Sequence, residues 1–210
     1  MKIGIIGSGK IGSVVGTLWA KAGHQVLFSS RHPEQLDELV KRAGSNTSRG
    51  SIEEALVFGE VIFLSIPYVA VQEFGRDYGK RLGGKIVIET GNPYPDRDGA
   101  IGQEVRDSPL GTGIYSQRWL PNTRLVRAFN SVWDQTLVSE AHRDGDQVGI
   151  PLAGNDGEAL RIVSDLVRQA GFDPVIVGPL ERAKDFDFGS KVYNTGMTAA
   201  EIRKELGIRS

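Results

Sequence analysis

The chain has 210 residues, a formal net charge of −1 at pH 7 and no cysteine. Its length fits one large domain, and its balanced charge gives no basis for binding nucleic acid or an anionic membrane. The lack of cysteine excludes disulfides, thiolate zinc sites and cysteine nucleophiles. No apolar run approaches the ~18 residues of a membrane helix. A strand predicted from residue 2 leaves no room for a signal peptide, so we expect a cytoplasmic protein.

The first predicted strand, residues 2–6, runs into the segment Gly7-Ser8-Gly9-Lys10-Ile11-Gly12. Apolar residues then recur with helical spacing, at Ile11, Val14, Val15, Leu18, Trp19 and Ala22. In such a strand–turn–helix, Gly7 allows the tight turn, Gly9 lets the backbone approach a pyrophosphate, and Gly12 lets the helix pack on the strand. The helix N-terminus attracts the phosphates. The segment therefore predicts a dinucleotide site.

A competing phosphate motif overlaps this segment. Gly4 to Lys10 has the G-x-x-x-x-G-K spacing that begins a P-loop. Ile11, however, stands where a serine or threonine must bind magnesium, and Gly4 lies within the strand. We therefore expect no nucleotide hydrolysis.

The next predicted strand, residues 25–30, indicates which dinucleotide is bound. NAD-binding proteins place a carboxylate about twenty residues after the glycine turn, on the ribose 2′-hydroxyl. Here the strand ends in Ser29, Ser30 and Arg31, and no carboxylate occurs between Gly7 and Glu34. Hydroxyls and a guanidinium suit a 2′-phosphate. We expect NADP(H), although Arg31 as a plain solvated turn residue is the alternative.

Continuous apolar strands alternate with amphipathic helices along the rest of the chain. We expect helices at 33–43, from Ser51, at 69–81, from Asp156 to 170 and at 198–206; strands at 61–66, 85–89, 125–130, 148–153 and 174–177; and a long loop at 93–113. This pattern is typical of an α/β fold, a Rossmann-like doubly wound and mainly parallel sheet with a small C-terminal α/β extension. We expect one NADP-binding domain, with a dinucleotide-binding core at 1–122 and an extension at 123–210 that completes the sheet and the acceptor site.

Ligands of doubly wound sheets lie beyond the carboxyl ends of the strands. Ile66 and Pro67 lie at the end of one strand and are expected to form an apolar wall against the nicotinamide. Asn92 and Asn130 lie at the ends of two others and are candidates to hydrogen-bond the ribose or the carboxamide. The alternative is that proline and asparagine simply end these strands.

No acid–base group stands out in the sequence, so the catalytic residues are unknown. The three histidines, His24, His32 and His142, all fall in predicted connections, and Asp134 and Tyr193 are isolated candidates. We expect no metal site, because no His and carboxylate cluster has metal spacing. Hydride transfer between two bound rings needs positioning more than acid–base groups.

With the glycine turn, Ser30-Arg31, Ser65-Ile66-Pro67 and residues 126–130 in view, nearly the whole chain resembles the NADPH-dependent coenzyme F420 reductase family, also called F420H2:NADP oxidoreductase. It is also similar to the NADPH-binding module of STEAP metalloreductases. The resemblance implies that Ser30 and Arg31 hold the 2′-phosphate and that Ile66-Pro67 lies near the nicotinamide. It further implies a homodimer and a hydride passed between NADPH and a deazaflavin.

The chain departs from the family pattern at two places. Gln35 stands where the family commonly has a lysine or a second arginine, and the loop at 91–95 differs from that of archaeal deazaflavin reductases. Three functions stay open. The first is an NADPH-dependent oxidoreductase with coenzyme F420, a flavin or another small planar hydride acceptor. The others are a non-enzymatic NADPH sensor and a dimeric reductase of the hydroxyacid or imine type.

Overall fold

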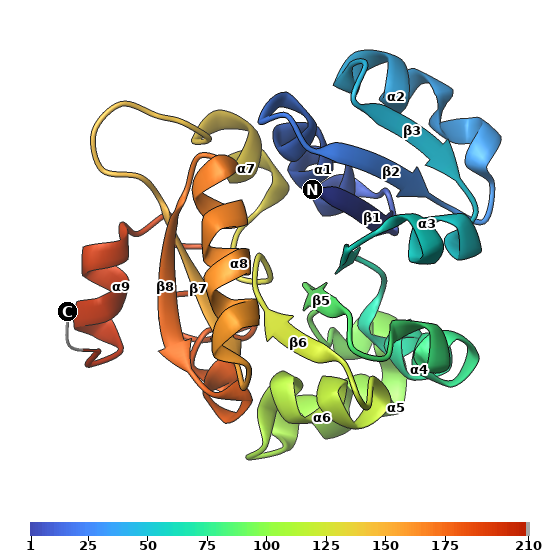
Figure 1. Ribbon diagram of the computed structural model, residues 1–210. Helices are drawn as coiled ribbons and strands as arrows, with labels where there is room; N and C mark the ends of the chain where they lie inside the picture. The colour runs from blue at the N-terminus through green and yellow to red at the C-terminus, as the bar shows by residue number, and fades with distance from the viewer. Residues whose placement is uncertain (209–210) are drawn as a thin grey trace.

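The structure, a computed structural model, describes residues 1–208 and consists of one eight-stranded sheet between two layers of helices (Figure 1). The strand order is β3-β2-β1-β4-β5-β6-β7-β8, and within residues 1–208 every neighbouring pair is parallel except β6 and β7. The strands are β1 Lys2–Ile6, β2 Gln25–Ser29, β3 Thr47–Gly50, β4 Val61–Leu64, β5 Ile86–Glu89, β6 Arg124–Arg127, β7 Gly149–Gly154 and β8 Asp173–Gly178. The predicted Rossmann-like, doubly wound fold is confirmed.

The helices cover the two faces of the sheet separately. They are α1 Lys10–Lys21, α2 Asp37–Ala43, α3 Ile52–Phe58, α4 Tyr68–Leu82, α5 Pro95–Asp107, α6 Gly111–Trp119, α7 Asp134–Ser139, α8 Gly157–Gln169 and α9 Ala199–Glu205, with 3-10 turns η1 Pro33–Leu36 and η2 Leu180–Asp185. Helices α1, α7 and α8 contribute to one apolar core, and α3, α4 and α5 to the other. A smaller core lies between β7, β8 and α9.

The N-terminal helix is fixed by aromatic packing on the first of these cores. Trp19 of α1 is fully buried and meets the edges of Phe63 and Phe129, with ring centroids 5.0 and 5.9 Å away. Its indole nitrogen donates to the Leu166 carbonyl oxygen of α8 at 2.8 Å. Because burial of large aromatic side chains dominates core energetics, this cluster holds the dinucleotide-binding helix against the C-terminal extension.

Several predicted elements differ in the structure. The loop expected at 93–113 is wrong, because this segment contains α5 and the start of α6, which begin at Pro95 and Gly111. Gly99, with a φ of 62°, kinks α5. The polar sequence of this helix also hides the helical period of its few apolar residues. The helix expected at 33–43 splits into η1 and α2. Strand β3 was missed because its sequence, Thr-Ser-Arg-Gly, is a short, partly exposed edge of the sheet.

Candidate active site

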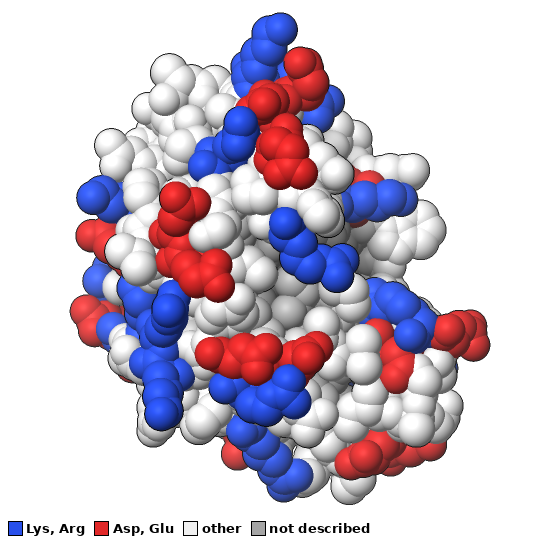
Figure 2. All heavy atoms as spheres, turned by 90° about the vertical axis from the view of Figure 1, so that its right-hand side faces the viewer, with Lys and Arg blue, Asp and Glu red and all other residues white. Residues whose placement is uncertain are grey.

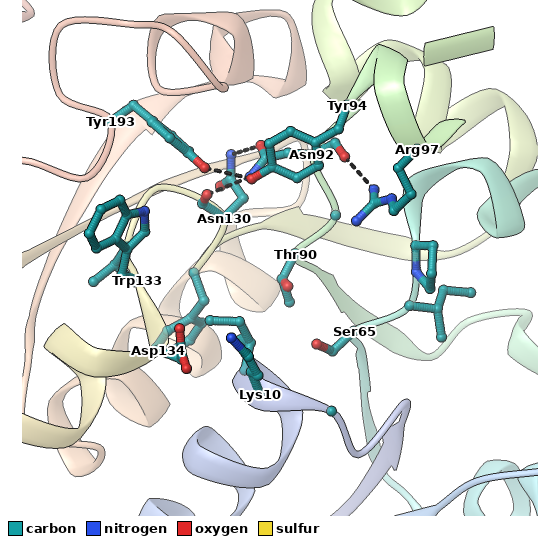
Figure 3. Close-up of a pocket in the computed structure, with 17 residues that line it drawn as sticks. Lys10, Ser65, Thr90, Asn92, Tyr94, Arg97, Asn130, Trp133, Asp134 and Tyr193 are labelled. Atoms are coloured by element: carbon teal, nitrogen blue, oxygen red, sulfur yellow. Dashed lines mark hydrogen bonds between the residues drawn. The ribbon is translucent and has the colours of Figure 1, made fainter. Parts of the chain in front are cut away.

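A cavity of about 450 Å³ opens where the strand order reverses, between β1 and β4 (Figure 3). This is the position at which open α/β sheets bind ligands. Segments that follow β1, β4, β5 and β6 line it, and Tyr193 joins them from near the C-terminal end. The lining residues are Gly9, Lys10, Ile11, Ser65, Ile66, Pro67, Thr90, Gly91, Asn92, Tyr94, Arg97, Phe129, Asn130, Val132, Trp133, Asp134 and Tyr193.

The glycine turn between β1 and α1 has the geometry that a pyrophosphate needs. Gly7 has a φ of 90°, and a Cβ at Gly12 would collide with the Gly7 carbonyl oxygen. A Cβ at Gly9, in contrast, would meet nothing within 4 Å. Gly9 is therefore open toward the cavity, while Gly7 and Gly12 are required by the packing of the turn. The first turn of α1 carries no acidic residue, which leaves its partial positive charge available to phosphates.

The residues expected to select NADP(H) cluster at the end of β2. The Ser8 hydroxyl donates to the Ser29 carbonyl oxygen at 3.1 Å, which ties the glycine turn to β2. The Ser29 hydroxyl is fully buried and donates to the Ile5 carbonyl oxygen at 2.7 Å, so it is used within the sheet. Ser30 Oγ accepts from the His32 backbone N–H at 2.8 Å, and Arg31 is exposed. Ser30 and Arg31 are thus the polar groups left for a ligand there.

Two asparagines that follow β5 and β6 lock together across the cavity wall. Asn92 Nδ2 donates to the Asn130 carbonyl oxygen at 2.7 Å, and Asn130 Nδ2 donates to Asn92 Oδ1 at 3.3 Å. Both residues are buried, and Asn130 Oδ1 has no hydrogen-bond partner within residues 1–208. A buried oxygen without a partner is costly unless a ligand or water satisfies it. Together with the open space at Gly9, it fits a dinucleotide with an amide or hydroxyl donor at its far end.

A buried ionic cluster of Glu89, Arg127 and Asp187 supports this wall from beneath. Arg127 is fully buried, pairs with the Glu89 carboxylate and donates to the Gly91 carbonyl oxygen at 2.8 Å. Glu89 also accepts from the Ser116 hydroxyl at 2.8 Å. Asp187 accepts from the Thr112 hydroxyl at 2.6 Å, and it lies 3.4 Å from Arg127 Nη2. The cluster therefore fixes the backbone that carries Gly91 and Asn92.

Burial and the neighbouring charges shift the pKa values of the ionic cluster in opposite directions. Burial alone lowers the pKa of Arg127, but the carboxylates of Glu89 and Asp187 outweigh it, so the pKa is raised and Arg127 stays a cation. Burial raises the pKa of Asp187, although Arg127 and Thr112 favour its charged form. Sequence reasoning missed this cluster, because nothing in a strand such as Arg124–Arg127 shows which charge is buried.

Aromatic residues form the end of the cavity that faces away from the glycine turn. Tyr94 and Tyr193 bring their hydroxyl oxygens to 2.6 Å of each other, and Figure 3 shows Trp133 beside them and Lys10 and Asp134 across the cavity. The Arg97 guanidinium lies over the Tyr94 ring, 4.9 Å from its centroid. Asp134 and Tyr193, isolated in the sequence, are thus brought into one site.

The aromatic end also contains residues that sequence reasoning missed. Tyr94, Arg97 and Trp133 all line the cavity, and none was predicted there. The only signal available was the position of Tyr94 close to Asn92 at a strand end. The histidines, His24, His32 and His142, do not line it.

The structure holds no sign of a metal site or a membrane span in the part of the chain that it describes. Residues 1–208 contain no group of three or more His, Cys, Asp or Glu side chains placed to hold a metal ion. None of the helices there has both the length and the apolar character needed to cross a bilayer. Basic and acidic side chains are interspersed over the face that Figure 2 shows.

The comparisons with known proteins agree with this geometry. Residues 2–93 match the sequence model of the family described as NADP oxidoreductase, coenzyme F420-dependent. This N-terminal segment is therefore similar to that family. The F420-dependent NADP reductase of Methanocaldococcus jannaschii is 29% identical over 196 residues, which cover 88% of this chain and 86% of the relative. The predicted resemblance is confirmed, and with it the class of NADP-dependent oxidoreductases.

Two further similarities extend beyond the matched segment. Metalloreductase STEAP3 of Rattus norvegicus is 27% identical over 194 residues, which cover 89% of this chain and 36% of that protein. The chain thus spans about a third of the length of this relative. The crystal structure of a hypothetical protein from Sinorhizobium meliloti has a TM-score of 0.78 at 24% identity, covering 94% of this chain and 95% of that one. Its likeness shows that the whole fold, including the extension, is shared.

Proposed function

We propose that this oxidoreductase transfers a hydride between NADP(H) and a small planar acceptor, such as coenzyme F420 or a flavin, in the 450 Å³ cavity. One observation carries the proposal: the open glycine turn at Gly9 leads directly into a cavity with the apolar Ile66-Pro67 wall on one side. A dinucleotide that enters along the turn reaches the aromatic end of the cavity, where a planar ring has room to stack.

The residues of the chain divide the binding of NADP(H) among themselves. The backbone from Gly7 to Gly12, with Lys10, holds the pyrophosphate at the start of α1. Ser30 and Arg31 hold the 2′-phosphate, and Asn130 Oδ1 accepts from the nicotinamide end. When bound, NADPH supplies the hydride. The protein orients the two rings and excludes water from the apolar wall of Ile66 and Pro67.

The roles of the two parts of the chain follow from the same geometry. We propose that residues 1–122 form the dinucleotide-binding core and that residues 123–210 complete the acceptor site, because Asn130, Trp133, Asp134 and Tyr193 all come from the second part. The cytoplasmic location and the homodimer expected from the sequence stay predictions.

The test of the proposed function is the oxidation of NADPH by the purified protein, followed by the loss of nicotinamide absorbance. Coenzyme F420, FMN, FAD and ferric chelates are each supplied as acceptor, and NADH is compared with NADPH. We expect turnover with a planar acceptor and a strong preference for NADPH. Tight NADPH binding without turnover on any acceptor would contradict the reductase and favour the sensor.

Substitution of Arg31 tests the assignment of the cofactor. Arg31→Ala removes a charged hydrogen-bond partner worth about 1.5–3 kcal/mol, so we expect the Kd for NADPH to rise about ten- to a hundredfold. The Kd for NADH should change less than about twofold, because NADH has no 2′-phosphate. Fluorescence titration measures both constants. Arg161→Ala, an exposed arginine on α8, is the matched control. An equal rise in the Kd for NADPH and the Kd for NADH would overturn the assignment of Arg31 to the 2′-phosphate.

A further inference from the structure

Two tyrosines meet at the acceptor end of the cavity and form one hydrogen-bonded unit. The hydroxyl oxygens of Tyr94 and Tyr193 lie 2.6 Å apart, a short distance for an O–H···O bond. Both side chains are half-buried and line the cavity, so their hydroxyls are reachable by a bound acceptor (Figure 3). Because one phenol donates to the other, the pair has a single O–H group left to donate outward.

The two phenols of the pair have different surroundings. The Arg97 guanidinium lies 4.9 Å from the centre of the Tyr94 ring and pairs with Asp98 at 2.7 Å, so this contact holds the Tyr94 ring in place. Burial, and then Tyr94 itself, raise the pKa of Tyr193. Either hydroxyl can donate in this hydrogen bond; when Tyr94 donates to Tyr193, the proton of Tyr193 is free to point into the cavity. That bond also polarises the outward O–H group.

Both phenols are held in place by rigid contacts. Phe188 meets the edges of both rings, at 5.0 Å from Tyr94 and 5.2 Å from Tyr193. The residue after Tyr193, Asn194, has a φ of 54° and donates its backbone N–H to the Ser131 carbonyl oxygen at 2.8 Å. This bond ties the C-terminal segment to the loop that carries Asn130. Two segments 99 residues apart in the chain are thus fixed to face one point.

We propose that Tyr94 donates to Tyr193 and that Tyr193 is a catalytic residue, which donates a hydrogen bond, and then a proton, to a carbonyl oxygen or ring nitrogen of the acceptor. Tyr94 is the positioning residue that orients and polarises it. This inference rests on the proposed function and narrows it, because it requires an acceptor with a heteroatom conjugated to the position that takes the hydride.

The transfer balances in atoms and electrons. The hydride from NADPH forms a new bond at the electrophilic ring atom, and the conjugated double bond of the acceptor breaks. Its electron pair moves to the heteroatom, which forms an O–H or N–H bond with the phenolic proton of Tyr193. The oxygen of Tyr193 takes the proton of Tyr94, and Tyr94 regains a proton from water. The acceptor gains two electrons and two hydrogens, and NADP⁺ is released.

The test uses the full-length variants Tyr193→Phe and Tyr94→Phe. The matched control is Tyr115→Phe, which removes a phenol that donates to Glu104 at 3.0 Å on the exposed surface. Thermal unfolding first establishes that all three variants are folded. NADPH affinity, the affinity of oxidised FMN and coenzyme F420 for the NADP⁺-loaded protein, and single-turnover acceptor reduction in H₂O and D₂O are then measured.

We expect NADPH affinity to stay within about twofold in every variant, because the pair lies at the acceptor end. In Tyr193→Phe, acceptor reduction should slow about a hundredfold. Acceptor affinity should fall about two- to tenfold, and the D₂O effect on the reduction step should change. Tyr94→Phe should slow reduction by about tenfold or less, since the proton donor stays in place.

Two outcomes separate the inference from the function on which it rests. If the wild-type protein reduces an acceptor and Tyr193→Phe matches Tyr115→Phe in rate, acceptor affinity and isotope effect, the role of Tyr193 is wrong and the reductase stands. If the wild-type protein binds NADPH but neither binds nor reduces FMN or coenzyme F420, both proposals fall.

Discussion

The two ends of the cavity are built in different ways. The dinucleotide end consists of one continuous strand, turn and helix, in which Gly7 and Gly12 shape the backbone and Gly9 leaves it open. The acceptor end is assembled from side chains that are distant in the chain, among them Tyr94, Trp133 and Tyr193. Backbone geometry thus determines where the cofactor binds, whereas folding determines what meets the acceptor.

The acceptor end depends on buried charge more than the dinucleotide end does. Its wall from Gly91 to Asn92 rests on the fully buried pair of Glu89 and Arg127. At the dinucleotide end, the contact between Ser8 and Ser29 uses neutral groups. Substitutions that remove a charge should therefore affect mainly the acceptor end. Substitutions that add a methyl group to the glycine turn should affect mainly the dinucleotide end.

The largest effect is expected from Arg127→Met. Removal of one partner leaves Glu89 buried without its counter-charge, which typically costs about 3–5 kcal/mol in the free energy of unfolding. Urea denaturation measures the loss. The double variant Glu89→Gln with Arg127→Met should recover part of it, because the buried Glu89 charge is removed as well and Asp187 keeps its hydrogen bonds from Thr112. A single variant as stable as the wild type would show that the ionic cluster does not support the acceptor end.

A smaller effect on stability is expected at the glycine turn. Gly12→Ala forces its Cβ against the Gly7 carbonyl oxygen, an overpacking that costs about 1–3 kcal/mol and also weakens NADPH binding. Gly9→Ala meets no atom of the protein within 4 Å, so we expect its unfolding free energy to stay within about 0.5 kcal/mol of the wild type.

The two glycine variants differ in the reason for their loss of binding. Gly9→Ala should still weaken the binding of NADPH, because its methyl group occupies the space through which the pyrophosphate approaches. Thermal unfolding and fluorescence titration of both variants give the comparison. Unchanged NADPH affinity in Gly9→Ala would place the dinucleotide elsewhere.

The smallest effect concerns the contact between the N-terminal strands and the extension. His24 Nε2 lies 2.8 Å from Gln169 Oε1 of α8, and Nδ1 lies 3.3 Å from the amino group of Met1. Burial lowers the pKa of His24 below 6.5; the amino terminus also lowers it, and Gln169 opposes the shift. The unfolded chain therefore binds the proton more readily, and stability should decrease as pH falls below about 6.5.

Chemical denaturation across this pH range measures the contribution of His24. His24→Gln should reduce the dependence of the unfolding free energy on pH, whereas His142→Gln, at an exposed histidine, should leave it unchanged. An identical pH dependence in the wild type and His24→Gln would show that this contact is insensitive to protonation.

The sequence by itself determined the parallel sheet, the glycine turn and the class of cofactor. Strand and helix periods are local properties, and the roles of Gly7 and Gly12 follow from the backbone of one turn. Only the tertiary structure decided that 93–113 contains helices, that Arg127 is buried and that Tyr94 meets Tyr193. The physical reason is distance along the chain: contacts across 99 residues arise from packing, and no local pattern of residues encodes them.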